Sequence, residues 1–126
     1  MANRHDELRM RLLATFQVEA EEHLQILTAN FLALGRGLPP AEARKVIEVS
    51  FREMHTLKGA ARSVGLSEVE TLCQSCESIL SKLSRDQLAL TPPILKLLHE
   101  ITHVSPDSCF VPKPGIYTYC HSDYLF

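Results

Sequence analysis

Through the first hundred residues, apolar side chains recur every three or four positions, which is the period of an α-helix. Glycine and proline interrupt this pattern at residues 35–40, at residue 65 and at residues 92–93, and so divide it into four runs. No β-strand pattern competes over this stretch. The sequence therefore predicts an all-α fold, an antiparallel up-and-down bundle of four helices. The apolar positions of the four runs are Leu13, Phe16, Ala20, Leu24, Leu27, Phe31 and Leu34; Ile47, Phe51, Met54, Leu57, Ala61 and Val64; Val69, Leu72, Cys73, Cys76, Leu80 and Leu83; and Ile94, Leu97, Leu98 and Ile101.

The helix ends are marked by residues with particular backbone preferences. The glycines and prolines at 35–40 end the first helix and form the turn into the second. Gly65 is placed to end the second helix in the left-handed conformation. Ser67, followed three positions later by Glu70, matches a capping box and predicts the start of the third helix. Thr91, followed by two prolines, predicts the start of the fourth.

The last part of the chain differs in composition from the rest. Residues 104–126 hold few charged side chains, several helix-breaking prolines and a glycine, and most of the aromatic residues of the chain. We therefore divide the chain into a helical domain at 1–103 and an irregular or poorly ordered tail at 104–126.

Composition narrows the classes of function. A formal net charge of −2 and an isoelectric point near 6.3 give no basic surface for nucleic acid or for an anionic membrane. No apolar run approaches the roughly 18 residues that a membrane helix needs, and the N-terminus lacks the apolar core of a signal peptide. We expect a cytoplasmic protein with reduced thiols. Its four cysteines are Cys73, Cys76, Cys109 and Cys120.

The second predicted helix carries a row of residues suited to chemistry on a histidine. His55, Lys58, Gly59 and Arg62 follow one another at i, i+3, i+4 and i+7, beside the apolar stripe. Imidazole is largely a neutral nucleophile near pH 7, and a lysine one turn along can pair with phosphate oxygens. Glycine inside a helix costs about 1 kcal/mol relative to alanine, which indicates a packing or functional reason for Gly59, such as clearance for a partner.

A nucleophilic histidine also needs an acceptor that fixes which ring nitrogen carries the proton. The third predicted helix offers polar side chains at helical spacing beside its apolar face. Glu70 is assigned to the capping box, so Glu77 or Gln74 is expected to accept from the ring of His55.

The stretch that begins at His55, with sequence HTLKGAA, resembles the phosphoacceptor motif of histidine phosphotransfer (HPt) domains, especially those at the N-terminus of chemotaxis-type and hybrid histidine kinases. The resemblance extends from about residue 13 to residue 103. It implies that His55 is the phosphorylated residue, that Lys58 steadies the phosphoryl group, that Gly59 gives clearance, and that Glu77 hydrogen-bonds the histidine ring. It also implies that Gln74 stands where some members have a second polar partner.

Two features depart from the family pattern. Arg62 stands where chemotaxis members often have glycine, which adds positive charge and makes it a candidate partner contact. The fourth helix is also expected to continue further than His103, whereas Pro106 interrupts it here.

The resemblance implies a phosphorelay. A histidine kinase catalytic domain phosphorylates His55, and an aspartate of a response-regulator receiver domain then takes the phosphoryl group. ATP and Mg²⁺ are expected on those partners, because this chain has no phosphate-cradling glycine loop and no acidic metal site. We expect a monomeric phosphocarrier that is not a complete enzyme alone and that is part of a longer histidine kinase.

Two other functions remain open. A helical docking or adaptor module would keep the apolar stripes without needing His55, Lys58 and Gly59 together. A metal- or redox-responsive protein would use Cys73 and Cys76, although both fall inside a predicted helix on its apolar face, where buried thiols are expected. The remaining histidines are interpreted as ordinary surface or core residues: His5, His23, His99, His103 and His121.

Overall fold

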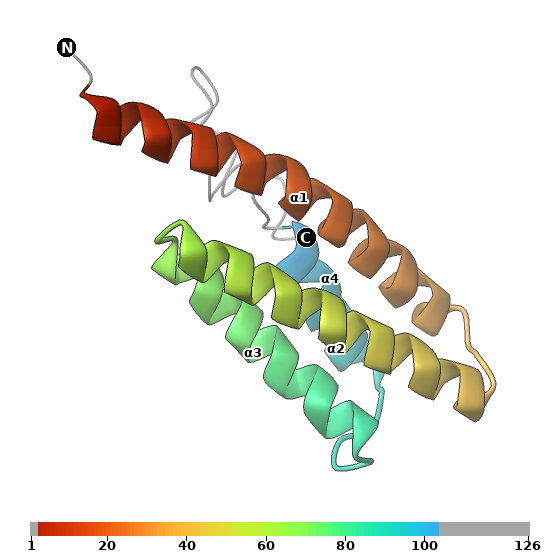
Figure 1. The fold of residues 1–126 in the computed structure, drawn as a ribbon. Coiled ribbons are helices and arrows are strands. Elements are labelled where there is room, and N and C mark those ends of the chain that lie inside the picture. The colour runs from red at the N-terminus through yellow and green to blue at the C-terminus, as the bar shows by residue number, and fades with distance from the viewer. Residues whose placement is uncertain (1–2, 104–126) are drawn as a thin grey trace.

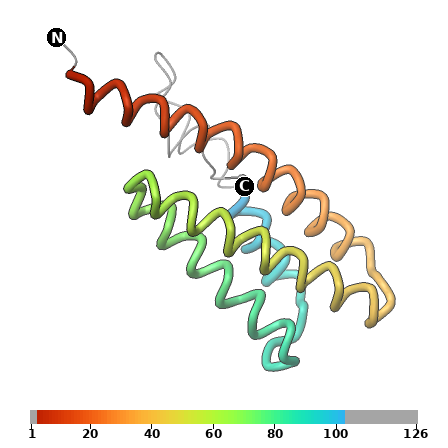
Figure 2. The backbone as a smooth tube through the Cα atoms, in the orientation of Figure 1, coloured from red at the N-terminus to blue at the C-terminus, as the bar shows by residue number. Residues whose placement is uncertain are grey.

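A computed structural model describes residues 3–103 of the chain as four helices and no strands. They are α1 (Arg4–Gly35), α2 (Pro40–Ser63), α3 (Ser67–Ser84) and α4 (Pro92–His103). Successive helices run in opposite directions, and α2 lies between α1 and α3 (Figure 1). The backbone trace shows α4 returning along the bundle to pack against α1 (Figure 2). The prediction of an all-α four-helix bundle is confirmed, while the predicted tail at 104–126 lies outside the described residues.

The turn from α2 to α3 is the sharpest connection in the described part of the chain. Gly65 has φ +77°, the left-handed conformation predicted for it. Its N–H donates to the carbonyl of Arg62, and the N–H of Leu66 donates to that of Ala61, which together form a Schellman motif. Leu66 is at the same time the N-cap of α3. This compact turn holds His55 and the residues of α3 on two adjacent, antiparallel helices.

The capping box predicted at Ser67 is wrong. Ser67 is the first residue of α3 rather than its N-cap, and no side chain caps this end of the helix. The Schellman motif turns the chain directly into α3, so Leu66 takes the cap position that the pattern assigned to serine. Glu70, which the pattern placed in the cap, instead faces Arg62 across the turn, with an Nε–Oε1 distance of 4.0 Å.

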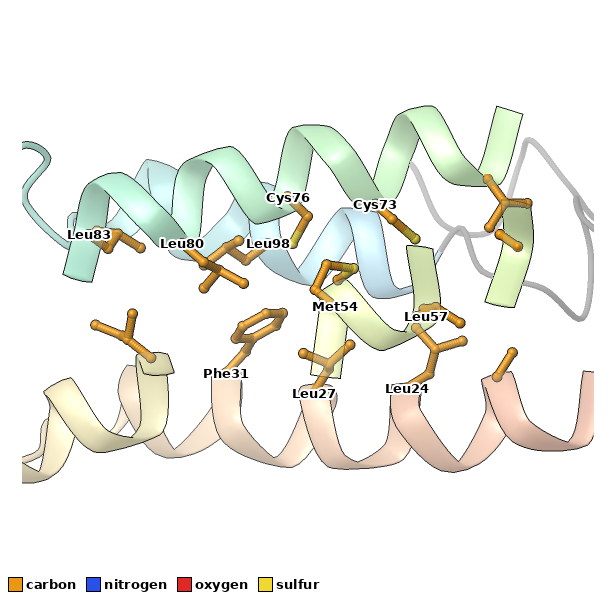
Figure 3. Packing of buried hydrophobic residues seen from close by; sticks show 14 of the residues in the cluster. Leu24, Leu27, Phe31, Met54, Leu57, Cys73, Cys76, Leu80, Leu83 and Leu98 are labelled. Carbon is orange, nitrogen blue, oxygen red and sulfur yellow. The ribbon is translucent and has the colours of Figure 1, made fainter. Parts of the chain in front are cut away.

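The helices pack around one apolar core that runs the length of the bundle. Figure 3 shows Leu24, Leu27 and Phe31 of α1 facing Met54, Cys76 and Leu80 across it. Burying a side chain as large as Phe31 is worth a few kcal/mol, so these contacts fix the register of the helices that carry the site. The buried apolar residues are Phe16, Ala20, Leu24, Leu27, Phe31, Leu34, Ile47, Met54, Leu57, Ala61, Val69, Cys73, Cys76, Leu80, Leu83 and Leu98.

Outside the core, the helices differ in how fully they are covered. The first turns of α1 project beyond the ends of α2 and α3, and no side chain of α1 before Phe16 is buried (Figure 1). In the last turns of α1, Phe31 and Leu34 are buried in the core, whereas Leu32 on the opposite face is exposed. Within residues 3–103, none of the helices combines the length and apolarity that crossing a membrane requires.

Candidate functional site

The imidazole of His55 lies on the outer surface of α2, next to α3. Its side chain is 63% exposed, and Nδ1 lies 3.1 Å from Oε1 of Glu77 on α3. An ionised carboxylate can only accept a hydrogen bond. The proton of the neutral ring therefore belongs on Nδ1, and the Nδ1–H group donates a hydrogen bond to Glu77. The second ring nitrogen, Nε2, then carries a free lone pair. One ring nitrogen is held by a neighbouring carboxylate and the other is free, which is an arrangement that suits a nucleophile.

Lys58, one turn along α2, approaches the same carboxylate. Its Nζ lies 2.6 Å from Oε2 of Glu77 and donates a hydrogen bond of 3.0 Å to Oε1 of Gln74. The side chain of Lys58 is only 21% exposed, because it turns toward α3 rather than toward solvent. Glu77 thus bridges the two α2 side chains, with one oxygen facing the imidazole and the other facing the ammonium group.

Glu77 is the buried centre of this group, with a side chain only 11% exposed. Burial opposes its ionisation, but the hydrogen bonds from Lys58 and His55 and the positive charge of Lys58 outweigh burial, so the pKa of Glu77 is lowered below its ordinary value of 4.5. At neutral pH the carboxylate is therefore ionised, and it stabilises positive charge on the ring of His55.

Gln74 lies in the site, but its contacts differ from those expected of it. Its side chain accepts from Lys58, and its Nε2 lies 3.4 Å from the hydroxyl of Ser78 on the same helix. The structure therefore joins Gln74 to the lysine, and of the two candidates Glu77 is the one that hydrogen-bonds the ring of His55.

Phe51 is a neighbour of His55 that sequence reasoning placed only in the apolar stripe. The two rings lie one helical turn apart on α2, with centroids 6.3 Å apart and planes inclined by 14°. This stacking restricts the rotation of the imidazole and leaves its edge, with the nitrogens, available. The signal that could have identified it is the i, i+4 spacing of two rings on one helix.

Gly59 and Arg62 lie beyond this group on α2. A Cβ atom built on Gly59 would have no heavy atom within 4 Å apart from its own helix, so the packing of the protein does not require glycine there. The surface beside the imidazole is therefore open. Arg62 is exposed and faces Glu70, so the structure does not join it to His55 or Lys58.

Other candidate groups lie away from this site. Cys73 and Cys76 are buried, and burial raises the pKa of each thiol to about 12, which keeps both protonated and unreactive. Within residues 3–103, no three histidine, cysteine or acidic residues are grouped closely enough to hold a metal ion. His23, interpreted from the sequence as an ordinary residue, forms a pair through Nδ1 with Oε2 of Glu53 across α1 and α2.

Comparison with known proteins gives consistent matches. The family model described as the Hpt domain matches residues 11–105. The chemotaxis protein CheA of Listeria monocytogenes is 33% identical over 91 residues, which are 72% of this chain and 14% of that protein. The chemotaxis protein CheA of Listeria innocua gives the same values, so the chain spans only a small part of the length of these relatives.

No solved structure matches the chain significantly. The fold and the site described above therefore rest on the geometry of this chain, and the family rests on the two sequence comparisons. The family model covers most of the chain, and the protein accordingly belongs to the Hpt family of histidine phosphotransfer domains.

Proposed function

We propose that His55 accepts a phosphoryl group on Nε2 from a histidine kinase catalytic domain and passes it to an aspartate of a response-regulator receiver domain. The observation that carries this proposal is the exposed imidazole whose Nδ1 is held by the buried carboxylate of Glu77. A hydrogen-bonded Nδ1–H leaves Nε2 as the nucleophilic nitrogen of a largely exposed ring.

In the first step, the lone pair of Nε2 attacks the γ-phosphorus of ATP held by the kinase domain. The N–P bond forms as the bond from phosphorus to the ADP oxygen breaks, and ADP leaves with that electron pair. The ring keeps its Nδ1 proton and gains positive charge, which the ionised Glu77 stabilises at 3.1 Å. Lys58 lies at the same carboxylate, and its flexible stem allows its ammonium group to turn toward the phosphoryl oxygens.

In the second step, a carboxylate oxygen of the receiver aspartate attacks phosphorus. The N–P bond breaks, its electron pair returns to Nε2, and the starting tautomer is restored. The open surface at Gly59 supports this step, because the partner must bring its carboxylate in line with the N–P bond.

ATP and Mg²⁺ belong to the partner domains in this proposal. The helical bundle supplies the nucleophile, its orientation and one cation, and it acts as a phosphocarrier rather than as a complete enzyme. Since the chain spans 14% of the CheA proteins it resembles, we place it within a longer histidine kinase in the cytoplasm.

The experiment is a phosphorylation assay with radiolabelled ATP and a histidine kinase catalytic domain. It compares the wild type with His55→Gln, and uses His23→Gln as a matched control, since His23 also pairs with a glutamate. Acid-labile, alkali-stable label that is absent only from His55→Gln is the expected result. Label that persists in folded His55→Gln contradicts the proposal, because the phosphoryl group would then be on another residue.

A further inference from the structure

A hollow of about 300 Å³ begins at the site and extends along α3 toward its C-terminal end. Its lining includes Phe51, which stacks on His55, and Glu77, which holds the ring. It also includes Lys82 and Arg85. The hollow therefore lies beside the reactive imidazole and shares two residues with its immediate surroundings.

The charge of this hollow is positive and uncompensated. Lys82 and Arg85 are exposed, and within residues 3–103 neither has an ion-pair partner. Asp86, the acidic residue next to Arg85 in the chain, pairs instead with Arg44 at 2.8 Å. The carboxylate of Glu77 is already engaged by Lys58. Two exposed cations thus lie at the C-terminal end of α3, Lys82 in its last turn and Arg85 at its C-cap, with no carboxylate of residues 3–103 paired to them.

We propose that this hollow binds an acidic side chain, aspartate or glutamate, on the surface of the receiver domain that takes the phosphoryl group. The proposal rests on the proposed function of His55. The hollow is also lined by polar side chains, among them that of Ser81, whose hydroxyl can donate to a carboxylate.

Electrostatics favour the receiver over the kinase as the occupant. The second transfer step brings a carboxylate up to a doubly charged phosphoryl group, and like charges repel as the two proteins approach. Positive side chains near the site, such as Lys82 and Arg85, offset that repulsion and steer the encounter. In the first step the kinase itself holds ATP together with the Mg²⁺ that offsets part of its charge, so these two cations are needed less there.

The test separates the two steps. The double variant Lys82→Glu/Arg85→Glu is compared with the wild type and with Lys96→Glu, which reverses an exposed cation on α4. His55 is first phosphorylated chemically with phosphoramidate, a small donor that needs no protein partner. The phosphorylated proteins are then mixed with a purified receiver domain that accepts from the wild type, and transfer is followed at several salt concentrations.

We expect the double variant to be phosphorylated by phosphoramidate at the wild-type rate but to transfer to the receiver about tenfold more slowly at low salt. The difference should shrink as salt rises, because exposed charges are screened. Lys96→Glu should transfer like the wild type. A neutral variant, Lys82→Gln/Arg85→Gln, should fall between the two.

Three results would overturn the inference. Equal transfer rates for the double variant and the wild type would show that the hollow takes no acidic side chain. Equal slowing of transfer and of the phosphoramidate reaction would show an effect through His55 itself. Slowing of phosphorylation by the kinase with unchanged transfer would assign the hollow to the kinase. Failure of the proposed function looks different, because wild-type His55 would then take no label at all.

Discussion

The bundle contains two histidine–glutamate pairs that differ in their surroundings, and α2 contributes one member to each. His55 of α2 meets Glu77 of α3, and His23 of α1 meets Glu53 of α2. In both pairs the ring uses Nδ1. The side chain of His55 is 63% exposed, whereas that of His23 is 23% exposed, as is that of Glu53. Both histidines make this contact from Nδ1 to a carboxylate, so the contact alone does not single out His55, the histidine proposed as the phosphoacceptor.

The residues that follow each histidine on its helix sharpen the contrast. Three positions on, His55 is followed by Lys58 and His23 by Ile26. Four positions on, the glycine after His55 leaves open surface, whereas the corresponding Leu27 is fully buried in the core. Of these two histidines, only His55 combines an exposed ring, a nearby cation and an open approach, and each of these features can be changed separately.

The largest effect should come from removing the nucleophile itself. Gln in place of His55 keeps a polar side chain but has no nucleophilic nitrogen, so phosphorylation by phosphoramidate or kinase should fall to background. His23→Gln should keep the wild-type rate and lose at most about 1 kcal/mol of stability with its hydrogen bond. Phosphorylation is measured by scintillation counting after alkaline treatment, and stability is measured by urea unfolding. Label found on His23 would show that pairing with a glutamate is enough to make a histidine accept a phosphoryl group.

The next largest effect should come from removing the positive charge of Lys58. Lys58→Met removes the ammonium group while keeping a long side chain, and should slow phosphorylation of His55 about 100-fold, the size seen when one charge-stabilising donor is removed from a reacting centre. Lys58→Arg should recover part of the rate. Single-turnover labelling measures both.

The reverse change tests the second pair. Ile26→Lys places a cation one turn from His23 on an exposed part of α1. His23 should remain unlabelled, because its ring is still largely covered. Labelling of His23 in this variant would show that the cation, rather than exposure, distinguishes the two pairs.

A smaller effect should follow from neutralising Glu77, and it should depend on pH. Glu77→Gln removes the charge that stabilises the ring and should slow phosphorylation about tenfold at neutral pH. The pKa of Glu77 is lowered in the folded protein, so its ionised form contributes stability above the ordinary value of 4.5, and that contribution is lost as pH falls through the lower folded value.

The free energy of unfolding of the wild type and of Glu77→Gln should therefore differ most near neutral pH and converge as the pH falls below 4.5 and through the lowered pKa of Glu77. Urea unfolding at a series of pH values from neutral to acid measures this difference in the free energy of unfolding. A difference that stays constant with pH would show that the carboxylate contributes nothing through its charge.

The sequence predicts the bundle because its strongest signals are local. The apolar period of each helix and the left-handed turn at Gly65 depend on a few neighbouring residues, and both are found in the structure. The sequence carries no glycine to mark the end of α3. A second Schellman motif ends this helix, and Asp86 takes φ +57° at the position where glycine is the usual residue.

The site shows the same division between local and long-range information. Helical spacing alone brings His55 and Lys58 to one surface. The hydrogen bond from Lys58 to Gln74 depends on the rotamers of side chains on two helices. The pairing of His23 with Glu53 depends on the register of α1 against α2. Neither is encoded within one helical turn, so spacing could not reveal them.

The smallest effect should come from closing part of the open surface beside His55. Gly59→Ala adds a methyl group that meets no heavy atom within 4 Å, and alanine favours the helix, so the variant should be more stable by about 0.5–1 kcal/mol. Its phosphorylation by phosphoramidate should be unchanged, whereas the larger Gly59→Leu should slow transfer to a receiver domain. Gly65→Ala is the matched control: Gly65 also has open space around it, but its φ of +77° is strained for alanine, and stability should fall by about 1 kcal/mol. If Gly59→Ala destabilised the protein as Gly65→Ala does, glycine at 59 would serve the fold, and open approach would no longer distinguish His55 from His23.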